Sequence, residues 1–172
     1  NHGVLHLGDT LTEGEALRFT GLPYFAPELF RMVEAADPLR TKQLRTGLAQ
    51  LSEEGAIQVL QPHVGGAPLL GAVGQLQFEV VAHRLKHEYG ADIRLLPAPY
   101  VAARWVTAET DAELTRFIDA NAMRIAHDVV EAPTFLATSQ AALQVAQEHW
   151  PKIRFHTRRE HAARDVYSET AA

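Results

Sequence analysis

Two segments in the first half of the chain have the apolar spacing of amphipathic helices. In the first, Leu44, Leu48 and Leu51 recur at i, i+4 and i+7, which places them on one stripe of a helix. Asp37 is a good N-cap for this helix, and Pro38 fits its first position, where a missing N–H costs nothing. The pattern therefore predicts a helix that begins directly after Asp37 and buries its leucines.

The second segment, QLQFEVVAHRLKHEYG over residues 75–90, predicts a helix with a broad apolar face. That face consists of Leu76, Phe78, Val80, Val81, Leu85 and Tyr89. Gly90 suits the left-handed position that ends many helices. We expect Leu48 and Val80 to pack against the same sheet, so truncation of either side chain to Ala should cost about 2–5 kcal/mol of stability.

Short apolar runs of strand length flank these two helices. They are residues 28–35, 56–62, 69–74 and 91–97. The first run, ELFRMVEA, is short enough to suit either a helix or a strand. If it is a strand, residues 28–98 follow the order βαββαβ. That order is typical of a ferredoxin-like plait, in which both helices lie on one face of an antiparallel sheet.

A second α/β half follows over residues 100–157. The strand-like runs YVAARWV, TFLATS and KIRFHT alternate with two amphipathic segments. One predicted helix runs from Asp111 to about Ala126, and the other is capped by Ser139 and stopped by Pro151. The predicted fold class is therefore α+β, with a plait that is extended by this second half.

The two ends of the chain have a different character. The Pro-rich segment LPYFAP, residues 22–27, indicates a domain boundary, and we interpret Tyr24 and Phe25 as an aromatic plug that would otherwise be exposed. Residues 162–172 are polar and lack periodicity, so we expect a disordered tail there.

Composition excludes several classes of protein. The 172 residues are 47% hydrophobic and 22% charged, which is typical of a globular chain. No cysteine is present, which excludes disulfides, thiolate catalysis and Cys-based zinc sites. No segment approaches the roughly 18 to 20 apolar residues of a membrane span, so no membrane partner is expected. The net charge of −5 disfavours binding of nucleic acid by bulk electrostatics.

Motifs for catalysis and phosphate binding are missing. The sequence contains no G-x-S-x-G, no H-E-x-x-H and no Gly-Lys dipeptide of a phosphate loop. The GAVG run before the second helix lacks a third glycine and a lysine, so tight packing explains Gly71 and Gly74 better than a phosphate site does. Trp105 and Trp150 have no interleaved aromatic residues for base stacking, and we interpret both as core or domain-contact residues.

The best metal candidate is the set Glu79, His83 and His87. Their i+4 spacing places all three on one face of the second helix, and a His-x₃-His pair can hold a divalent ion. No fourth ligand is evident, and a solvent-facing polar stripe explains the same residues, so we favour the stripe. From the residues alone, the chain is a binding or scaffolding module.

Several stretches resemble a known family. GDTLTEGE, within residues 8–15, is similar to the last strands of the β-barrel domain of translational GTPases. FTGLPYFAPELFRMV, DPLRTKQLRTGLAQLSEEGAIQVLQP and GAVGQLQFEVVAHRLKHEY resemble the release factor 3 family of these GTPases. The closing RFHTRREH is similar to the end of the same family, so the resemblance covers nearly all residues up to His161.

The resemblance implies a C-terminal fragment without the G domain. Residues 1–22 would be the terminal strands of the barrel domain, and residues 23–161 the C-terminal α+β domain. The family's GTP and Mg²⁺ belong to the missing G domain, so this fragment is expected to hold no cofactor, bind no nucleotide and have no enzymatic activity. The implied role is in the cytoplasm, where the family acts on the terminating ribosome and promotes dissociation of codon-reading release factors.

The implied partners are small-subunit RNA and protein of the ribosome, with the codon-reading release factors as indirect partners. Because the overall charge is negative, docking must rely on a few local cations. The candidates for ribosome contact are Arg158, Arg159, His161, Lys152, Arg40, Lys42 and Arg45. The same arginines have a simpler explanation as surface residues that pair with nearby carboxylates.

Two other functions stay open from the sequence. The chain is compatible with a free-standing ferredoxin-like module that regulates or binds a ligand. It is also compatible with a metal-dependent enzyme built on Glu79, His83 and His87. The true start of the gene would test the first alternative, and the amount of bound zinc would test the second.

Overall fold

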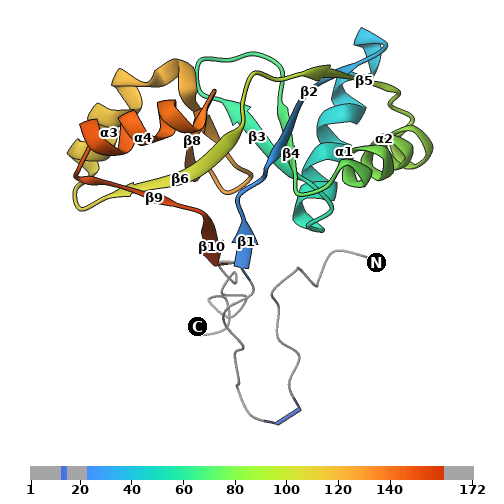
Figure 1. Cartoon of the computed structure of the whole chain (residues 1–172). Coiled ribbons are helices and arrows are strands. Elements are labelled where there is room, and N and C mark those ends of the chain that lie inside the picture. The colour runs from blue at the N-terminus through green and yellow to red at the C-terminus, as the bar shows by residue number, and fades with distance from the viewer. Residues whose placement is uncertain (1–12, 15–22, 161–172) are drawn as a thin grey trace.

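The computed structural model describes residues 13–14 and 23–160, where an eight-stranded antiparallel sheet carries four α-helices and a two-stranded ribbon stands apart (Figure 1). The helices are η1 (Pro38–Arg40), α1 (Thr41–Glu53), α2 (Gln75–Tyr89), α3 (Asp111–Ala120), η2 (Ala122–Arg124) and α4 (Gln140–His149). The strands are β1 (Pro23–Phe25), β2 (Leu29–Ala35), β3 (Gln58–Pro62), β4 (Leu69–Ala72), β5 (Ile93–Pro97), β6 (Ala102–Ala108), β7 (Ile125–His127), β8 (Pro133–Ala137), β9 (Ile153–His156) and β10 (Arg158–Glu160). The barrel strands predicted within residues 1–22 and the tail predicted at residues 162–172 lie outside these described residues.

The first half of the sheet follows the predicted order of elements. Along the chain it runs β2-α1-β3-β4-α2-β5, the βαββαβ order expected for residues 28–98, and the strands lie side by side as β5-β2-β4-β3. Asp37 caps η1 by accepting a hydrogen bond from the backbone N–H of Leu39 at 2.9 Å. Gly55 and Gly90, with φ of 73° and 65°, end α1 and α2 in the left-handed region.

The second half repeats this order. It runs β6-α3-β7-β8-α4-β9, and its strands lie side by side as β9-β6-β8-β7. Ser139 caps α4 as predicted, because its hydroxyl accepts a hydrogen bond from the N–H of Ala142 at 3.0 Å. The helix predicted to run to Ala126 is too long, since α3 ends at Ala120 and Ile125 begins β7.

The two halves form one continuous sheet because β3 pairs with β7 in antiparallel register, with Pro62 opposite Ala126. Alternate residues of each strand face opposite sides, so the sheet has a helix-covered face and an opposite face. In β2, for example, Val33 packs in the cluster under α1 and α2, whereas Phe30 packs in a separate cluster on the opposite face. Figure 1 shows α1 and α2 against one half of the sheet and α3 and α4 against the other.

The sheet is curved, and a short connection requires that curvature. β5 and β6 occupy the first and seventh positions in the sheet, which would separate them by about 29 Å if it were flat. The chain from Pro97 to Ala102 covers five residue steps, which reach at most about 18 Å. The concave face holds a core cluster that includes Phe30, Leu60 and Leu136, and Tyr100 from this connection packs against it.

Helix α2 buries a narrower face than its sequence predicts. Phe78, Val81 and Leu85 are buried under it, but Leu76 and Val80 are 68% and 46% exposed. The expectation that Val80 packs against the sheet is therefore wrong, because its position on the helix points it toward solvent. Leu48 of α1 is 2% exposed and lies in the predicted core.

The Pro-rich segment before β2 is a strand and not a plug. β1 pairs antiparallel with β10, so that Phe25 lies opposite Arg158. Phe25 remains 58% exposed, which corrects the expectation that its ring is covered. Trp105 is 4% exposed and Trp150 packs against the cluster under α3 and α4, so both tryptophans belong to the core as predicted.

Candidate functional site

Arg159, one of the predicted contact residues, is held by the domain itself. Its guanidinium forms an ion pair with Asp128 at 2.8 Å, and its side chain is only 25% exposed. The same guanidinium lies over the Trp105 ring, 5.7 Å from the ring centroid. The side chain therefore fastens the β1–β10 ribbon to the sheet, which sequence reasoning missed because Asp128 lies 31 positions earlier in the chain.

Lys152, another predicted contact residue, is bound to Glu113 of α3. This hydrogen bond lowers the pKa of the Glu113 carboxyl and raises the pKa of Lys152. Arg154 similarly lies 3.5 Å from a carboxylate oxygen of Glu109. Lys152 and Arg154 thus both face carboxylates at or just before the start of α3.

Arg158 differs from these neighbours because its side chain is exposed. It lies on β10, where it points away from the sheet side that Arg159 contacts, as alternation along a strand requires. His161 lies outside the described residues. Among the described arginines of the closing motif, Arg158 and Arg154 are thus both exposed, and Arg154 faces Glu109.

A second basic group lies at the start of the first helix, on η1 and α1. Arg40, Lys42 and Arg45 are all exposed, and within the described residues no ion pair involves them. Leu39 beside them is 87% exposed. These three predicted residues are thus exposed cations within residues 40–45, next in sequence to an exposed leucine, while the other predicted cations lie toward the far end of the chain.

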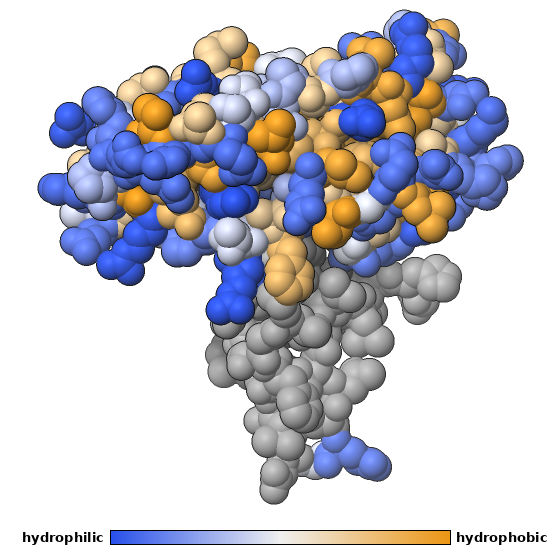
Figure 2. All heavy atoms as spheres, viewed as in Figure 1, coloured by the Kyte–Doolittle hydropathy of each residue, from blue (hydrophilic) through white to orange (hydrophobic). Residues whose placement is uncertain are grey.

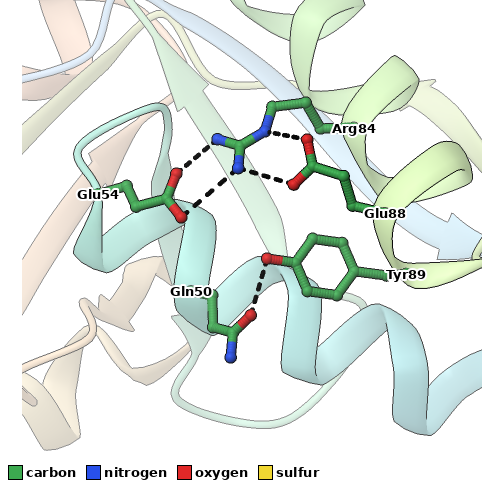
Figure 3. A network of polar contacts seen from close by, with 5 residues as sticks. All are labelled: Gln50, Glu54, Arg84, Glu88 and Tyr89. Atoms are coloured by element: carbon green, nitrogen blue, oxygen red, sulfur yellow. Dashed lines mark hydrogen bonds and ion pairs between the residues drawn. The ribbon is translucent and has the colours of Figure 1, made fainter. Parts of the chain in front are cut away.

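The outer surface of α1 and α2 carries a polar network (Figure 3). Arg84 donates hydrogen bonds to Glu88 at 2.7 and 2.8 Å and also to Glu54 of α1, and Tyr89 donates one to Gln50 at 2.8 Å. These carboxylates raise the pKa of Arg84, and its guanidinium lowers the pKa of Glu88. The network ties the two helices together, and its single guanidinium faces two carboxylates.

The predicted metal candidates lie on the exposed face of α2. Glu79, His83 and His87 are all exposed, and the rings of the two histidines lie 4.3 Å apart between centroids. In the described part of the chain, no group of three or more His, Cys, Asp or Glu side chains is arranged to hold a metal ion. A different histidine pair, His63 and His127, meets where β3 joins β7, with Nδ1 and Nε2 3.0 Å apart.

In the glycine-rich run before α2, close packing explains one of the two glycines but not the other. A Cβ on Gly71 would lie 2.5 Å from Pro27, so close approach explains this residue. A Cβ on Gly74 would meet nothing within 4 Å, so the packing explanation is wrong there. The side chain of Gln77 accepts hydrogen bonds from the N–H groups of Val73 and Gly74, and this occupies donors that a phosphate would need.

The described residues define a class of protein before any comparison is made. They form an α/β body in which several exposed charges lie in ion pairs, while several exposed cations lie in none within the described residues, as in a binding or docking module. Among the helices that the structure describes, none has the length and apolar character needed to cross a membrane.

Comparison with known proteins identifies the family. The model of the C-terminal domain of class II release factor RF3 matches residues 19–147, and the chain belongs to this family. Peptide chain release factor 3 of Nitrosomonas europaea is 70% identical over 94% of this chain, and that of Bordetella pertussis is 65% identical over 99%. The protein of the same name from Aromatoleum aromaticum is 52% identical over 94% of the chain.

The chain is much shorter than these relatives. It spans 30% of the Nitrosomonas europaea protein and 32% of the Bordetella pertussis protein. It corresponds to their C-terminal domain.

Proposed function

We propose that this chain is the C-terminal domain of a release-factor GTPase and docks that protein on the ribosome during translation termination. Membership of the release factor family is the observation that carries the proposal. In this role the full-length protein promotes dissociation of codon-reading release factors in the cytoplasm. Family membership does not favour the alternative of a free-standing regulatory module.

We also propose that GTP and Mg²⁺ bind in the part of the full-length protein that lies outside this chain. The chain has no Gly-Lys dipeptide, and without that loop nothing cradles the β- and γ-phosphates. Isothermal titration calorimetry of this chain should therefore give no saturable GTP binding. Micromolar GTP binding by this chain would contradict both its assignment as the C-terminal domain and the proposal that the nucleotide binds elsewhere in the full-length protein.

We also propose how the chain divides into structural units. Residues 1–22 would end the β-barrel domain, and residues 28–98 would form a ferredoxin-like plait. The order β2-α1-β3-β4-α2-β5 supports the plait.

The docking contacts are proposed at the exposed cations. Arg40, Lys42 and Arg45 are exposed on η1 and the start of α1, and no described carboxylate is paired with them. Arg158 is exposed as well. Arg159 and Lys152 are weaker candidates, because moving them to a phosphate would break existing contacts with Asp128 and Glu113.

Ribosome affinity at several salt concentrations tests these contacts in the full-length protein. Each cation that neutralises a phosphate adds about 0.9 to the slope of log affinity against log salt. We therefore expect simultaneous replacement of Arg40, Lys42 and Arg45 by Ala to reduce the slope by about two to three.

The matched control is Arg154→Ala, which removes an exposed arginine that already faces Glu109. It should leave the slope within about 0.3 of the wild type, because surface pairs contribute little. An unchanged slope in the triple variant, with unchanged melting temperature, would exclude this face as the docking surface.

A further inference from the structure

The surface of the body mixes hydrophilic and hydrophobic side chains, as Figure 2 shows for one face. A polar side chain on such a surface is commonly solvated and changes rotamer within nanoseconds, so a ligand site is marked by polar atoms that neighbouring groups hold in place. In a chain without cysteine, histidine nitrogens are the ligands that suit Zn²⁺, Cu²⁺ and Ni²⁺. The nitrogens of His63 and His127 are held in this way.

Both histidines are positioned by the strand pairing that joins the two halves of the sheet. β3 pairs with β7, and Gln61 lies opposite His127. The backbone N–H of His63 donates a hydrogen bond to the carbonyl of Ile125 at 2.9 Å, which continues this pairing past the end of β3. Hydrogen-bonded backbone thus brings together two rings that are 64 positions apart in the sequence, so little freedom remains to be lost when a ligand binds.

The hydrogen bonds of His127 determine which of its nitrogens carries a proton. Nδ1 lies 3.3 Å from the carbonyl oxygen of Glu131. Because a carbonyl oxygen only accepts, Nδ1 carries the proton of the neutral ring, and Nε2 has the free lone pair. Glu131 has a φ of 61°, an uncommon left-handed conformation for a residue with a side chain. A backbone carbonyl that orients an imidazole in this way is a common outer partner of metal-binding histidines.

The two facing nitrogens are separated by nearly the distance between two ligands of one metal ion. Nδ1 of His63 lies 3.0 Å from Nε2 of His127. Zn–N bonds of about 2.0–2.1 Å at a tetrahedral angle place two nitrogens roughly 3.3 Å apart. The pair would have to widen by only about 0.3 Å to admit the ion. His63 is exposed, so its ring has room for this movement.

We propose that His63 and His127 form a binding site for a divalent transition-metal ion such as Zn²⁺. Without the ion, the Nδ1–H of His63 donates to Nε2 of His127. When Zn²⁺ binds, this proton moves through solvent to Nε2 of His63, so that both facing lone pairs bind the ion and no net proton is released. Water completes the coordination, because the described part of the chain holds no group of three or more His, Cys, Asp or Glu ligands.

The bound ion would link the two halves of the sheet through side chains. The pairing of β3 with β7 is short, with Gln61 opposite His127 and Pro62 opposite Ala126. Because the histidines come from the two sides of this pairing, a shared ion resists its opening and stabilises the folded state as the ion concentration rises. This site is separate from the proposed docking cations, and its test requires no ribosome.

Isothermal titration calorimetry with ZnCl₂ tests the site in the untagged 172-residue chain. We expect saturable binding that His63→Gln and His127→Gln each weaken at least about tenfold, since each removes one of two ligands. The matched control replaces His83 and His87 of α2 together by Gln and should leave this binding unchanged. MgCl₂ should give no binding, because Mg²⁺ requires oxygen ligands.

Two further measurements locate the ion. Imidazole nitrogen shifts in NMR spectra of the wild type should change on addition of Zn²⁺ at Nδ1 of His63 and at Nε2 of His127. At a zinc concentration about 100 times the Kd, the melting temperature of the wild type should rise by about 5–10 °C. The His63→Gln variant should show no such rise.

Three results would overturn the proposal. They are the absence of saturable binding at roughly millimolar Zn²⁺, binding that survives His63→Gln, and binding that disappears when His83 and His87 are replaced. Melting curves without zinc show whether each variant folds. If a variant does not fold, unchanged nitrogen shifts of His63 and His127 in the wild type would still overturn the proposal.

Discussion

One aspartate joins three parts of the second half of the domain. Asp128 accepts a hydrogen bond from the indole Nε1–H of Trp105 at 3.0 Å. It also accepts the backbone N–H groups of Val130 and Ala132, which shapes the turn between β7 and β8, and it pairs with Arg159. With a side chain only 10% exposed, this carboxylate holds a strand, a turn and the ribbon in one arrangement.

Replacing Asp128 by Ala should therefore destabilise the domain strongly. The change removes the acceptor of three N–H groups and one partner of the half-buried Arg159 guanidinium, and breaking such a pair costs about 3–5 kcal/mol. Urea unfolding measures the loss, with the exposed Asp119→Ala as a control that should stay within about 0.5 kcal/mol of the wild type. A loss below about 1 kcal/mol for Asp128→Ala would mean that the ribbon is not fastened here.

Gly47 in α1 presents two opposing expectations. Helix propensity favours Ala over Gly by about 1 kcal/mol. In this structure, however, a Cβ at Gly47 would lie 2.5 Å from Cδ2 of Leu85 and 2.9 Å from Cγ of Tyr89. The glycine lets α1 and α2 approach closely, so packing should outweigh propensity.

We predict that Gly47→Ala lowers the free energy of unfolding by about 1–3 kcal/mol, as overpacking of a filled core does. Chemical denaturation compares it with Gly74→Ala, where the added Cβ would meet nothing within 4 Å. If Gly47→Ala instead raised stability, the two helices would have to lie farther apart than described.

At the scale of elements, the spacing of apolar residues and the capping residues predicted most of the helices, because both act within a few positions of the chain. Helices α2 and α4 follow from their apolar stripes and caps, and Ser139 caps its helix as the sequence indicates. Helix α1 follows from its leucine stripe but begins at Thr41, because Asp37 caps the 3-10 helix η1 that precedes it. Helix α3 was predicted too long because Ile118 and Ile125 keep helical spacing. Asn121, whose side chain donates a hydrogen bond to the carbonyl of Phe117, marks its actual end.

Contacts between residues far apart in the sequence could not be predicted from local sequence patterns. β1 and β10 have three residues each and find their hydrogen-bond partners across more than a hundred positions, so neither strand has a signal of its own. A separation of 31 positions likewise hides the pairing of Arg159 with Asp128, and this pairing changes the interpretation of a basic cluster that looks free in the sequence. No ion pair within the described residues involves the cations at the start of α1, so their exposure is the part of the basic pattern that the sequence could predict.

The polar network between α1 and α2 makes part of the stability dependent on pH. Arg84 lowers the pKa of Glu88 in the folded state below its ordinary value of 4.5. A carboxyl of this kind stabilises the folded state above its unfolded pKa, and the contribution is lost as pH falls through the folded pKa. The contribution of Arg84 should therefore be present at pH 7 and vanish in acid.

Thermal unfolding of Arg84→Gln between neutral and acidic pH measures this contribution of Arg84 to stability. The melting temperature should lie below that of the wild type at pH 7, and the gap should close as the pH falls below about 4.5. The exposed Arg94→Gln serves as the control for loss of one positive charge. A gap that stays constant from neutral to acidic pH would mean that the ion pairs contribute nothing to stability.

At the scale of the whole molecule, the two halves share a core. Leu60 of the first half and Leu136 of the second are 0% and 1% exposed in the same cluster on the concave face. Neither half can lose this cluster alone, so the domain should unfold in one transition.

Leu60→Ala tests this coupling. It should cost about 2–5 kcal/mol and lower the stability of both halves together. Tryptophan fluorescence reports the second half, which contains both Trp105 and Trp150, and amide exchange of α2 reports the first. Different losses by the two probes would show that the halves unfold separately, while the exposed Leu39→Ala should change neither.

The pairing of the first and last described strands also sets how the domain responds to pulling. Pro23 and Glu160 lie opposite each other at one end of the β1–β10 ribbon. A force applied at these two residues opens the ribbon like a zipper, one rung after another, instead of shearing all rungs at once. The eight-stranded sheet carries no load until the ribbon has parted, so the ribbon acts as a mechanical fuse that yields at low force and spares the core.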